Sequence, residues 1–314
     1  MFKRLILLIV LVIFGSIGFD YAKDRLNLDV KLDEVATYIE QVTEQVANNE
    51  KIAELVTQEP LDSAIIPVDS ASTAAPQGAV TTTEELANAI YYYASHYETN
   101  FTIEYKGDTS QLETMIQSAY DMLETQDPYV YGHLSDRNIE FSYTSRKATL
   151  NFNQQYLTTY EQERYVNGKV QAILGSVNYG ALSDYEKVKY VNDYIVQHTA
   201  YSEATEASPH SAYAILYEGK GVCQGYALLA YKLLSEMGME ALYVTGEVYT
   251  GGHAWNLVKV DGEWYHLDTT WNDPVPDRGA GVRYDYFLIN DSQMASDHSW
   301  NSTKYPQAVS TVYK

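Results

Sequence analysis

The 314-residue chain has 21 basic and 42 acidic residues, a formal net charge of −21 at pH 7, and 46% hydrophobic residues. This composition is typical of a globular protein with a sizeable core, and the length permits one large domain or two modest ones. The negative charge argues against nucleic acid or an anionic membrane surface as the main partner, since both need a basic protein surface. A single cysteine, Cys223, excludes an intramolecular disulfide framework and any multi-cysteine metal site.

The N-terminus has the pattern of an export signal. Lys3 and Arg4 precede an apolar run over residues 5–14, and the first acid is Asp20. The uncharged run over 5–19, at about 1.5 Å per residue in a helix, is shorter than a hydrocarbon core of about 30 Å. Residues 1–22 are therefore predicted to be either a cleaved signal or an uncleaved anchor with a single transmembrane helix. Either way, we expect the body of the protein to be extracellular or at the cell surface.

Residues 23–57 are predicted to form a long helical stem, because apolar side chains alternate spacings of four and three. These side chains belong to Leu28, Leu32, Val35, Ile39, Val42 and Val46. The helix either separates the domain from the membrane and pairs with a second copy as a homodimer, or lies on its own domain. Residues 58–80 are rich in Pro, Ser, Ala, Thr and Gly without periodicity and are predicted to be a linker.

Residues 81–175 are predicted to form a small α+β region. Thr82 and Glu85 have the spacing of a capping box, so a helix should begin there. Apolar alternation predicts a strand at 101–105, a helical stripe follows over 112–123, and two further alternating runs predict a hairpin around 139–152. No group of titratable residues in this region suggests chemistry.

Residues 176–314 contain the residues that suggest a catalytic domain. A second capping box at Ser183 and Glu186 predicts a helix whose apolar stripe includes His198, which we expect to be a core residue. Further on, a flexible glycine-rich turn leads into a helix that ends at Gly238. Cys223 lies in the first turn of that helix, where unpaired N–H groups and the helix dipole stabilise a thiolate.

A strand pair after this helix supplies a base and a carboxylate. Asp261 and Gly262 are a strong two-residue hairpin signal, and with that loop the numbers of opposed residues sum to 523. His253 then opposes Thr270, and Asp268 lies diagonally from His253 on the same face. A slip of one residue would place the two side chains on opposite faces, so the assignment depends on the length of the turn.

We therefore predict a triad in which Cys223 is the nucleophile, His253 the base and Asp268 the group that orients the base. This requires the Cys223 helix to pack on the sheet face of His253, Trp255 and His266. His266 is expected to serve packing. A mononuclear metal site of Cys223, His253, His266 and Asp268 is the alternative, but a thiol at a helix start favours the nucleophile.

Three blocks resemble the bacterial branch of the transglutaminase-like superfamily: GVCQGYA at 221–227, GHAWN at 252–256 and WYHLDTTWNDP at 264–274. The resemblance covers about 183–288 and implies an α+β fold with a papain-like core, in which a nucleophile helix packs on an antiparallel sheet. It also implies that Cys223, His253 and Asp268 form the family's catalytic triad. The family's oxyanion stabiliser, often an aromatic residue upstream of the cysteine, has no unambiguous match.

Three residues are therefore only candidates for the oxyanion site and the substrate cleft: Tyr201, Gln224 and Trp255. The predicted activity is that of an exported cysteine-dependent acyl-transfer enzyme acting on protein or peptide amides, with cell-wall peptide as one candidate substrate. Water as acceptor would make the enzyme a protease or amidase, and an amine would make it a transglutaminase. The chemistry needs no cofactor, and the sequence has no calcium-loop spacing. A non-catalytic peptide- or cell-wall-binding module is the alternative.

Overall fold

The computed structural model describes residues 75–274 and 281–313. The chain divides into two compact units, Met1–Ser70 and Ala71–Lys314, and the described residues all belong to the second. The export segment, the stem and residues 58–74 of the linker lie outside the described residues and stay predictions. Among the residues that the structure describes, none of the helices is long and apolar enough to cross a membrane.

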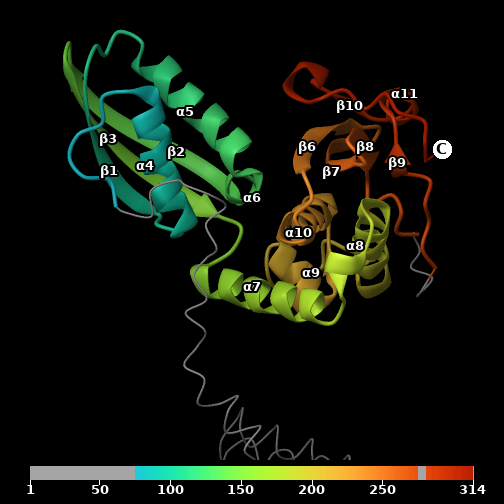
Figure 1. Cartoon of the computed structure of the whole chain (residues 1–314). Helices are drawn as coiled ribbons and strands as arrows, with labels where there is room; N and C mark the ends of the chain where they lie inside the picture. Colours follow the sequence, from blue (N-terminus) through green and yellow to red (C-terminus); the bar gives the residue numbers. More distant parts are fainter. Residues whose placement is uncertain (1–74, 275–280, 314) are drawn as a thin grey trace, which may run out of the picture. The chain divides into compact units, whose positions relative to one another are not determined.

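The first part of the described unit is a three-stranded antiparallel sheet with strand order β1-β3-β2, packed with two long helices, α4 and α5 (Figure 1). Its elements are α4 (Thr83–Ser95), β1 (Asn100–Lys106), α5 (Leu112–Gln126), α6 (Pro128–Gly132), β2 (Leu134–Thr144) and β3 (Lys147–Tyr156). Alternate residues of β1 are buried and exposed, because the helices cover one face of the sheet.

The helix start and the hairpin predicted from the sequence are both present in this part. The Thr82 hydroxyl accepts from the backbone N–H of Glu85 and starts α4. The strands β2 and β3 form the predicted hairpin around Ser145 and Arg146. Val80, which the sequence places at the end of the linker, is buried and pairs with β1 at Tyr105, so the packed structure includes it.

The second part contains a five-stranded antiparallel sheet with strand order β10-β6-β7-β8-β9 (Figure 1). Its longer elements are α7 (Tyr160–Gly175), α8 (Asp184–His198), α9 (Ala212–Glu218), α10 (Cys223–Glu236), β6 (Ala241–Val248), β7 (Gly251–Val260) and β8 (Glu263–Leu267). The shorter ones are β4 (Ala200–Tyr201), β5 (Lys220–Gly221), β9 (Phe287–Ile289), α11 (Asp291–Met294) and β10 (Ser299–Trp300). Together the two parts form an α+β fold, as predicted.

The β7–β8 hairpin has the predicted register. Val260 opposes Glu263 and Asn256 opposes Leu267, so each opposed pair sums to the expected number. Asp261 and Gly262 both have positive φ, 51° and 87°, as a two-residue turn between twisted strands requires. The side chains of His253 and Asp268 therefore lie on the same side of the sheet.

The helix α10, however, packs on the opposite face, so the predicted packing of this helix on the face of His253 and Trp255 is wrong. Ala254 and Val258 share a core with α10, and the Asn256 side chain donates to the Ala227 carbonyl over 3.1 Å. Trp255 belongs instead to a separate core formed with Val244, Leu257, Ile289, Met294 and Ala308. Both faces of the sheet are therefore covered, which the alternation in β7 alone does not reveal.

A buried carboxylate at Glu163, on α7, joins the two parts. Tyr129 donates to Oε2 over 2.8 Å and Thr158 to Oε1 over 2.9 Å, while His133 Nε2 lies 3.3 Å from Oε1. Burial raises the pKa of Glu163, but His133, Lys232 and Tyr129 outweigh burial and lower the pKa to about 2. The carboxylate therefore favours the folded state as long as it is ionised.

The first prediction follows from this lowered pKa. The stabilisation by Glu163 should be complete above the unfolded pKa of about 4.5 and should be lost as the pH falls through about 2. Glu163→Gln should therefore lower the free energy of unfolding by on the order of 2–3 kcal/mol near neutral pH. Urea unfolding between pH 7 and pH 2 should show that this difference shrinks in acid.

Glu161→Gln is the matched control, since Glu161 lies on the same helix but its side chain is 76% exposed. A difference for Glu163→Gln that does not change with pH would contradict the prediction.

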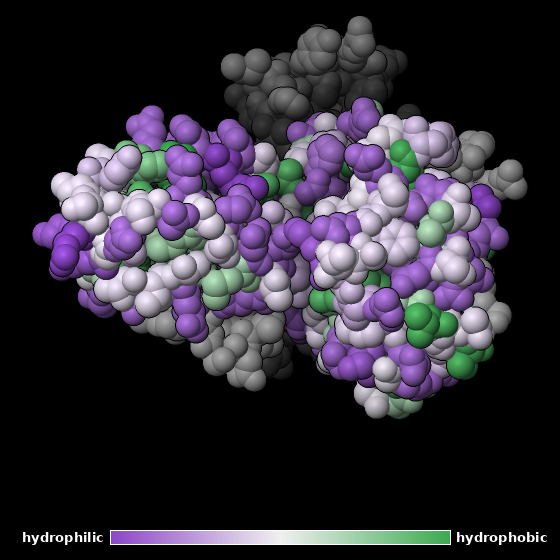
Figure 2. Space-filling view, turned by 90° about the horizontal axis from the view of Figure 1, so that it is seen from above, coloured by the Kyte–Doolittle hydropathy of each residue, from purple (hydrophilic) through white to green (hydrophobic). Residues whose placement is uncertain are grey.

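Polar residues predominate on the face of the surface shown in Figure 2, where hydrophobic residues form small separate patches. Most of the large hydrophobic residues that are exposed are tyrosines, whose hydroxyl groups can remain hydrated: Tyr143, Tyr160, Tyr201, Tyr217, Tyr249 and Tyr284. This face therefore offers no extended apolar patch.

Candidate active site

Cys223 is the first residue of α10, as the sequence predicts. The residue before it, Val222, has an extended backbone and no side-chain group that could cap the helix, while its N–H is bonded to the Pro209 carbonyl over 2.9 Å. The thiol is partly exposed. It therefore sits at the positive end of a helix, where an anion is stabilised.

The glycines beside Cys223 serve close packing. A Cβ at Gly221 would lie 2.5 Å from an Ile215 methyl carbon, and a Cβ at Gly225 would lie 2.8 Å from the Ser211 carbonyl oxygen. Neither glycine has positive φ, whereas Gly219 does, at 66°. The expectation of a flexible glycine turn is therefore wrong for the two glycines flanking the thiol, which let another backbone segment approach the start of α10.

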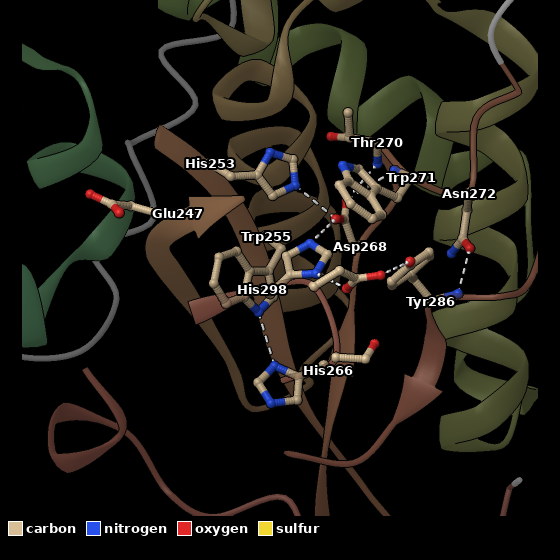
Figure 3. A network of polar contacts seen from close by, with 12 residues as sticks. Glu247, His253, Trp255, His266, Asp268, Thr270, Trp271, Asn272, Tyr286 and His298 are labelled. Carbon is tan, nitrogen blue, oxygen red and sulfur yellow. Dashed lines mark hydrogen bonds and ion pairs between the residues drawn. The ribbon is translucent and has the colours of Figure 1, made fainter. Parts of the chain in front are cut away.

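His253 and Asp268 meet as the register predicts. His253 Nε2 lies 2.7 Å from Asp268 Oδ2 (Figure 3). A hydrogen bond with Cys223 also contributes to the raised pKa of His253, and the other ring nitrogen, Nδ1, is available for it. His253 reaches the thiol although α10 covers the opposite face, because each residue lies near the start of its own element. The structure therefore brings Cys223, His253 and Asp268 together in that order.

Charge at this site favours a protonated histidine. Burial lowers the pKa of His253, but its hydrogen bonds to Asp268 and Cys223 outweigh burial and raise the pKa to about 9. Asp268 is 1% exposed; burial raises its pKa, while hydrogen bonds from His253 and His298 lower it below its usual value. An imidazolium between a thiol and an ionised carboxylate is the arrangement that activates a cysteine nucleophile.

The Asp268 carboxylate is held on both oxygens. Oδ1 accepts from the backbone N–H groups of Thr270 and Trp271, over 2.9 and 3.1 Å. Oδ2 accepts from His253 and, over 3.2 Å, from His298 Nε2. His298 lies 30 residues further along the chain and was not predicted as a site residue. The only signal for it in the sequence is its place in an Asp-His-Ser-Trp stretch at 297–300.

Tyr201 lies beside the thiol. It is 44% exposed, and β4 pairs in parallel with β5, so that Tyr201 is aligned with Gly221 two residues before Cys223. Burial and the negative charges of Cys223, Glu203 and Asp268 raise the pKa of Tyr201, so its phenol stays protonated and can donate a hydrogen bond. The position suits an oxyanion donor.

Gln224 and Trp255 have other partners. The Gln224 side-chain amide donates to the Gly132 carbonyl over 2.8 Å and links α10 to α6. Trp255 is 1% exposed, and its indole N–H donates to His266 Nδ1 over 2.9 Å beneath the site. The polar groups of both side chains are therefore bonded to other parts of the protein rather than to Cys223 or His253.

Two other predicted roles change. Asp273, which the sequence places in the Asn-Asp-Pro turn after the last strand of the hairpin and where turn capping is the expected role, is buried and accepts a hydrogen bond of 2.6 Å from Tyr226 of α10, so it also helps hold the nucleophile helix. His198, expected in the core, is exposed at the end of α8 with its ring stacked on Tyr194. The apolar stripe of this helix turns to solvent at its last residue.

Within residues 75–274 and 281–313, the residues that could hold a metal are His253, Asp268 and His298, whose ligand atoms lie within 4.8 Å of one another. The metal set considered from the sequence does not form, since His266 binds Trp255 and Asp291 instead. A tetrahedral zinc ion with bonds of about 2.1 Å needs ligand atoms roughly 3.4 Å apart, whereas His253 Nε2 and Asp268 Oδ2 are 2.7 Å apart. The three residues fit a hydrogen-bond network better than a metal site.

Comparison with known proteins agrees with this geometry. Residues 171–269 match the model of the transglutaminase-like superfamily. The chain contains a transglutaminase-like domain. The matched residues include the helix with Cys223, the strand with His253 and, at its end, Asp268.

The curated relatives are proteins called kyphoscoliosis peptidase. The mouse (Mus musculus) protein is 29% identical over 155 residues, which cover 41% of this chain and 23% of that protein. The human (Homo sapiens) protein is 28% identical over the same length and the same shares. The similarity to this chain thus spans less than a quarter of the length of either relative.

Two solved structures are also similar to this chain. One, described as the crystal structure of a TGase, has 16% identity and a TM-score of 0.31, covering 54% of this chain and 50% of that one. The other, a Cytophaga hutchinsonii protein assigned as a cysteine protease, has 18% identity and a TM-score of 0.30, covering 56% and 73%.

The second prediction concerns the thiol. Because the His253 imidazolium stabilises a thiolate, Cys223 should react with iodoacetamide at about pH 6 far faster than a free cysteine, and His253→Ala should remove at least a tenfold advantage. The measurement is the alkylation rate of the full chain by mass spectrometry. His198→Ala, an exposed histidine elsewhere on the domain, is the control and should not change the rate; equal rates in all three proteins would refute the ion pair.

Proposed function

We propose that this protein is a cysteine-dependent acyl-transfer enzyme that attacks amide bonds of protein or peptide substrates. The observation that carries the proposal is the placement of Cys223 at the start of α10 beside His253, with Asp268 2.7 Å from the far side of the imidazole. The match to the transglutaminase-like superfamily supports this choice of chemistry.

The residues suggest the following sequence of steps. The Cys223 thiolate attacks the amide carbonyl carbon, and the His253 imidazolium donates its proton to the departing amine, which leaves a thioester on Cys223. Water or a primary amine then attacks the thioester while His253 accepts the proton, and the thiolate leaves. Asp268 keeps the ring oriented throughout, and the Tyr201 phenol can donate to the oxyanion.

Peptide cleavage is the outcome that the names of the curated relatives suggest for those proteins. For this chain, hydrolysis and transfer to an amine both remain within the proposal, because the triad serves either acceptor. Export is also part of the proposal, resting on Lys3, Arg4 and the apolar run over 5–14. Substrates would then be peptides outside the cytoplasm, with cell-wall peptide as one class.

The third prediction tests the reaction. The full chain is incubated with a peptide library, with and without a labelled primary amine. It should form hydrolysed or amine-labelled peptides, which Cys223→Ser should not form. Mass spectrometry separates the two acceptors: hydrolysis adds water across the amide, whereas transfer attaches the labelled amine in place of the original one.

Peptides retained by both proteins without any change in mass would instead favour a binding module. The partly exposed position of Cys223, and the placement of His253 between Cys223 and Asp268, argue against that outcome.

The fourth prediction concerns pH. His253 must be protonated to donate to the leaving amine, and its pKa is raised to about 9. The rate of acylation should therefore hold through neutral pH and fall as the pH rises through about 9. Single-turnover release of the amine product, measured from pH 6 to pH 10, should show this alkaline decline; a decline centred near the usual histidine value would contradict the role of Asp268.

A further inference from the structure

The Asp268 carboxylate has two imidazole partners on one oxygen. His253 Nε2 and His298 Nε2 lie 2.7 and 3.2 Å from Oδ2, and the His298 ring is 3% exposed (Figure 3). His253 also interacts with Cys223. His298 is thus a buried titratable residue at the site that the proposed mechanism does not use.

The partners of His298 define its charge. Its Nε2 faces Asp268, and its Nδ1 lies 2.7 Å from Asp297 Oδ1. An ionised carboxylate only accepts hydrogen bonds, so each ring nitrogen of His298 is placed to donate to a carboxylate. The other oxygen of Asp297 accepts from the Tyr286 hydroxyl over 2.5 Å, which fixes this second carboxylate.

A neighbouring histidine shows the contrast. His266 Nδ1 accepts from the Trp255 indole N–H, while Nε2 donates to Asp291. One nitrogen accepts and the other donates, as in a neutral imidazole. Burial is the main cause that lowers the pKa of His266. The two buried histidines therefore differ in their partners: His266 faces one donor and one carboxylate, whereas His298 faces two carboxylates.

Aromatic rings surround the His298 imidazolium. The centroids of Trp271, Trp255 and Tyr286 lie 4.4, 5.2 and 5.4 Å from that of His298. A buried cation is costly unless it is paired, and aromatic rings at these distances attract cations. Two carboxylates and three rings thus hold the charge in place.

We propose that His298 is a positioning residue, a fixed imidazolium that orients the Asp268 carboxylate and shares its negative charge with His253. The proposal rests on the proposed function, since it assigns His298 a role in that same site. The rings of His253 and His298 are 5.3 Å apart, close enough for their charges to repel. His298 would therefore limit how far Asp268 raises the pKa of His253, so that the imidazolium can still give up its proton.

The titratable groups that face His298 come from every neighbouring element. They are His253 from β7, His266 from β8, Asp268 after β8, Tyr286 before β9, and Asp297 beside it. Removing the positive charge from His298 while leaving a donor to Asp268 should raise the pKa of His253, because it removes a repulsive neighbour. Loss of the Asp268 orientation alone should lower the pKa of His253, so the two roles give shifts of opposite sign.

Two variants remove the charge in different ways. His298→Gln keeps an N–H donor of similar reach. Asp297→Asn keeps His298 but replaces the acceptor at Nδ1 by an amide that can donate, so the ring can become neutral while Nε2 still donates to Asp268. His266→Gln is the matched control, a buried histidine of the same sheet that has no hydrogen bond to Asp268.

The experiment is a pH titration of the full chain labelled with ¹⁵N-histidine, followed by NMR without substrate. In the wild type, both ring nitrogens of His298 should be protonated at pH 7. The titration midpoint of His253 should rise by about 0.5 to 1 pH unit in His298→Gln and in Asp297→Asn, and should not move in His266→Gln. The pH at which Cys223 alkylation declines in acid should rise in the same two variants, because the thiolate also loses the electrostatic stabilisation by the His298 charge.

An unprotonated Nδ1 in wild-type His298, or a His253 midpoint that stays or falls in both variants, would overturn the proposal. If His298→Gln does not fold, Asp297→Asn decides, because the Asp297 side chain is 33% exposed and its replacement is nearly isosteric. Shifted midpoints without any amide turnover would refute the proposed function but not the electrostatic role of His298. Amide turnover with unshifted His253 midpoints would support the proposed function and refute the electrostatic role of His298.

Discussion

The buried carboxylate of Asp268 is the constraint on which the rest of the site depends. An ionised carboxylate that is 1% exposed is very costly without compensation. Two backbone N–H groups satisfy Oδ1 and two imidazoles satisfy Oδ2. These four donors come from β7, from the turn after β8 and from the chain just before β10, so ionisation of one side chain requires three segments to be in place together.

The hairpin turn at Asp261 and Gly262 decides whether Asp268 can meet His253 at all. Both residues adopt the positive φ that a two-residue turn needs, and this sets the register of β7 against β8. A one-residue slip would turn Asp268 toward the core beneath α10, where His253 could not reach it. The chemistry of the site thus depends on a turn that lies at the far end of both strands.

The nucleophile helix is positioned by contacts of a different kind. Gly221 and Gly225 allow the segment at 209–211 to approach the start of α10, and Tyr226 bonds Asp273 beyond β8. Gln224 bonds the Gly132 carbonyl, which ties α10 to the smaller α+β part. The GVCQGYA block therefore combines one reactive side chain with several residues that fix where the helix begins.

The sequence by itself determined what depends on neighbours along the chain: the helix N-cap at Thr82, the capping box at Ser183, the β7–β8 register, the helix start at Cys223 and the pairing of His253 with Asp268. Each follows from short-range hydrogen bonding or from strand alternation. Only the tertiary structure decided which face α10 covers, that Gln224 and Trp255 have partners away from the cleft, and that His298 bonds Asp268. Strand alternation is the same whichever face is covered, and contacts between distant segments depend on how those segments pack rather than on any local pattern.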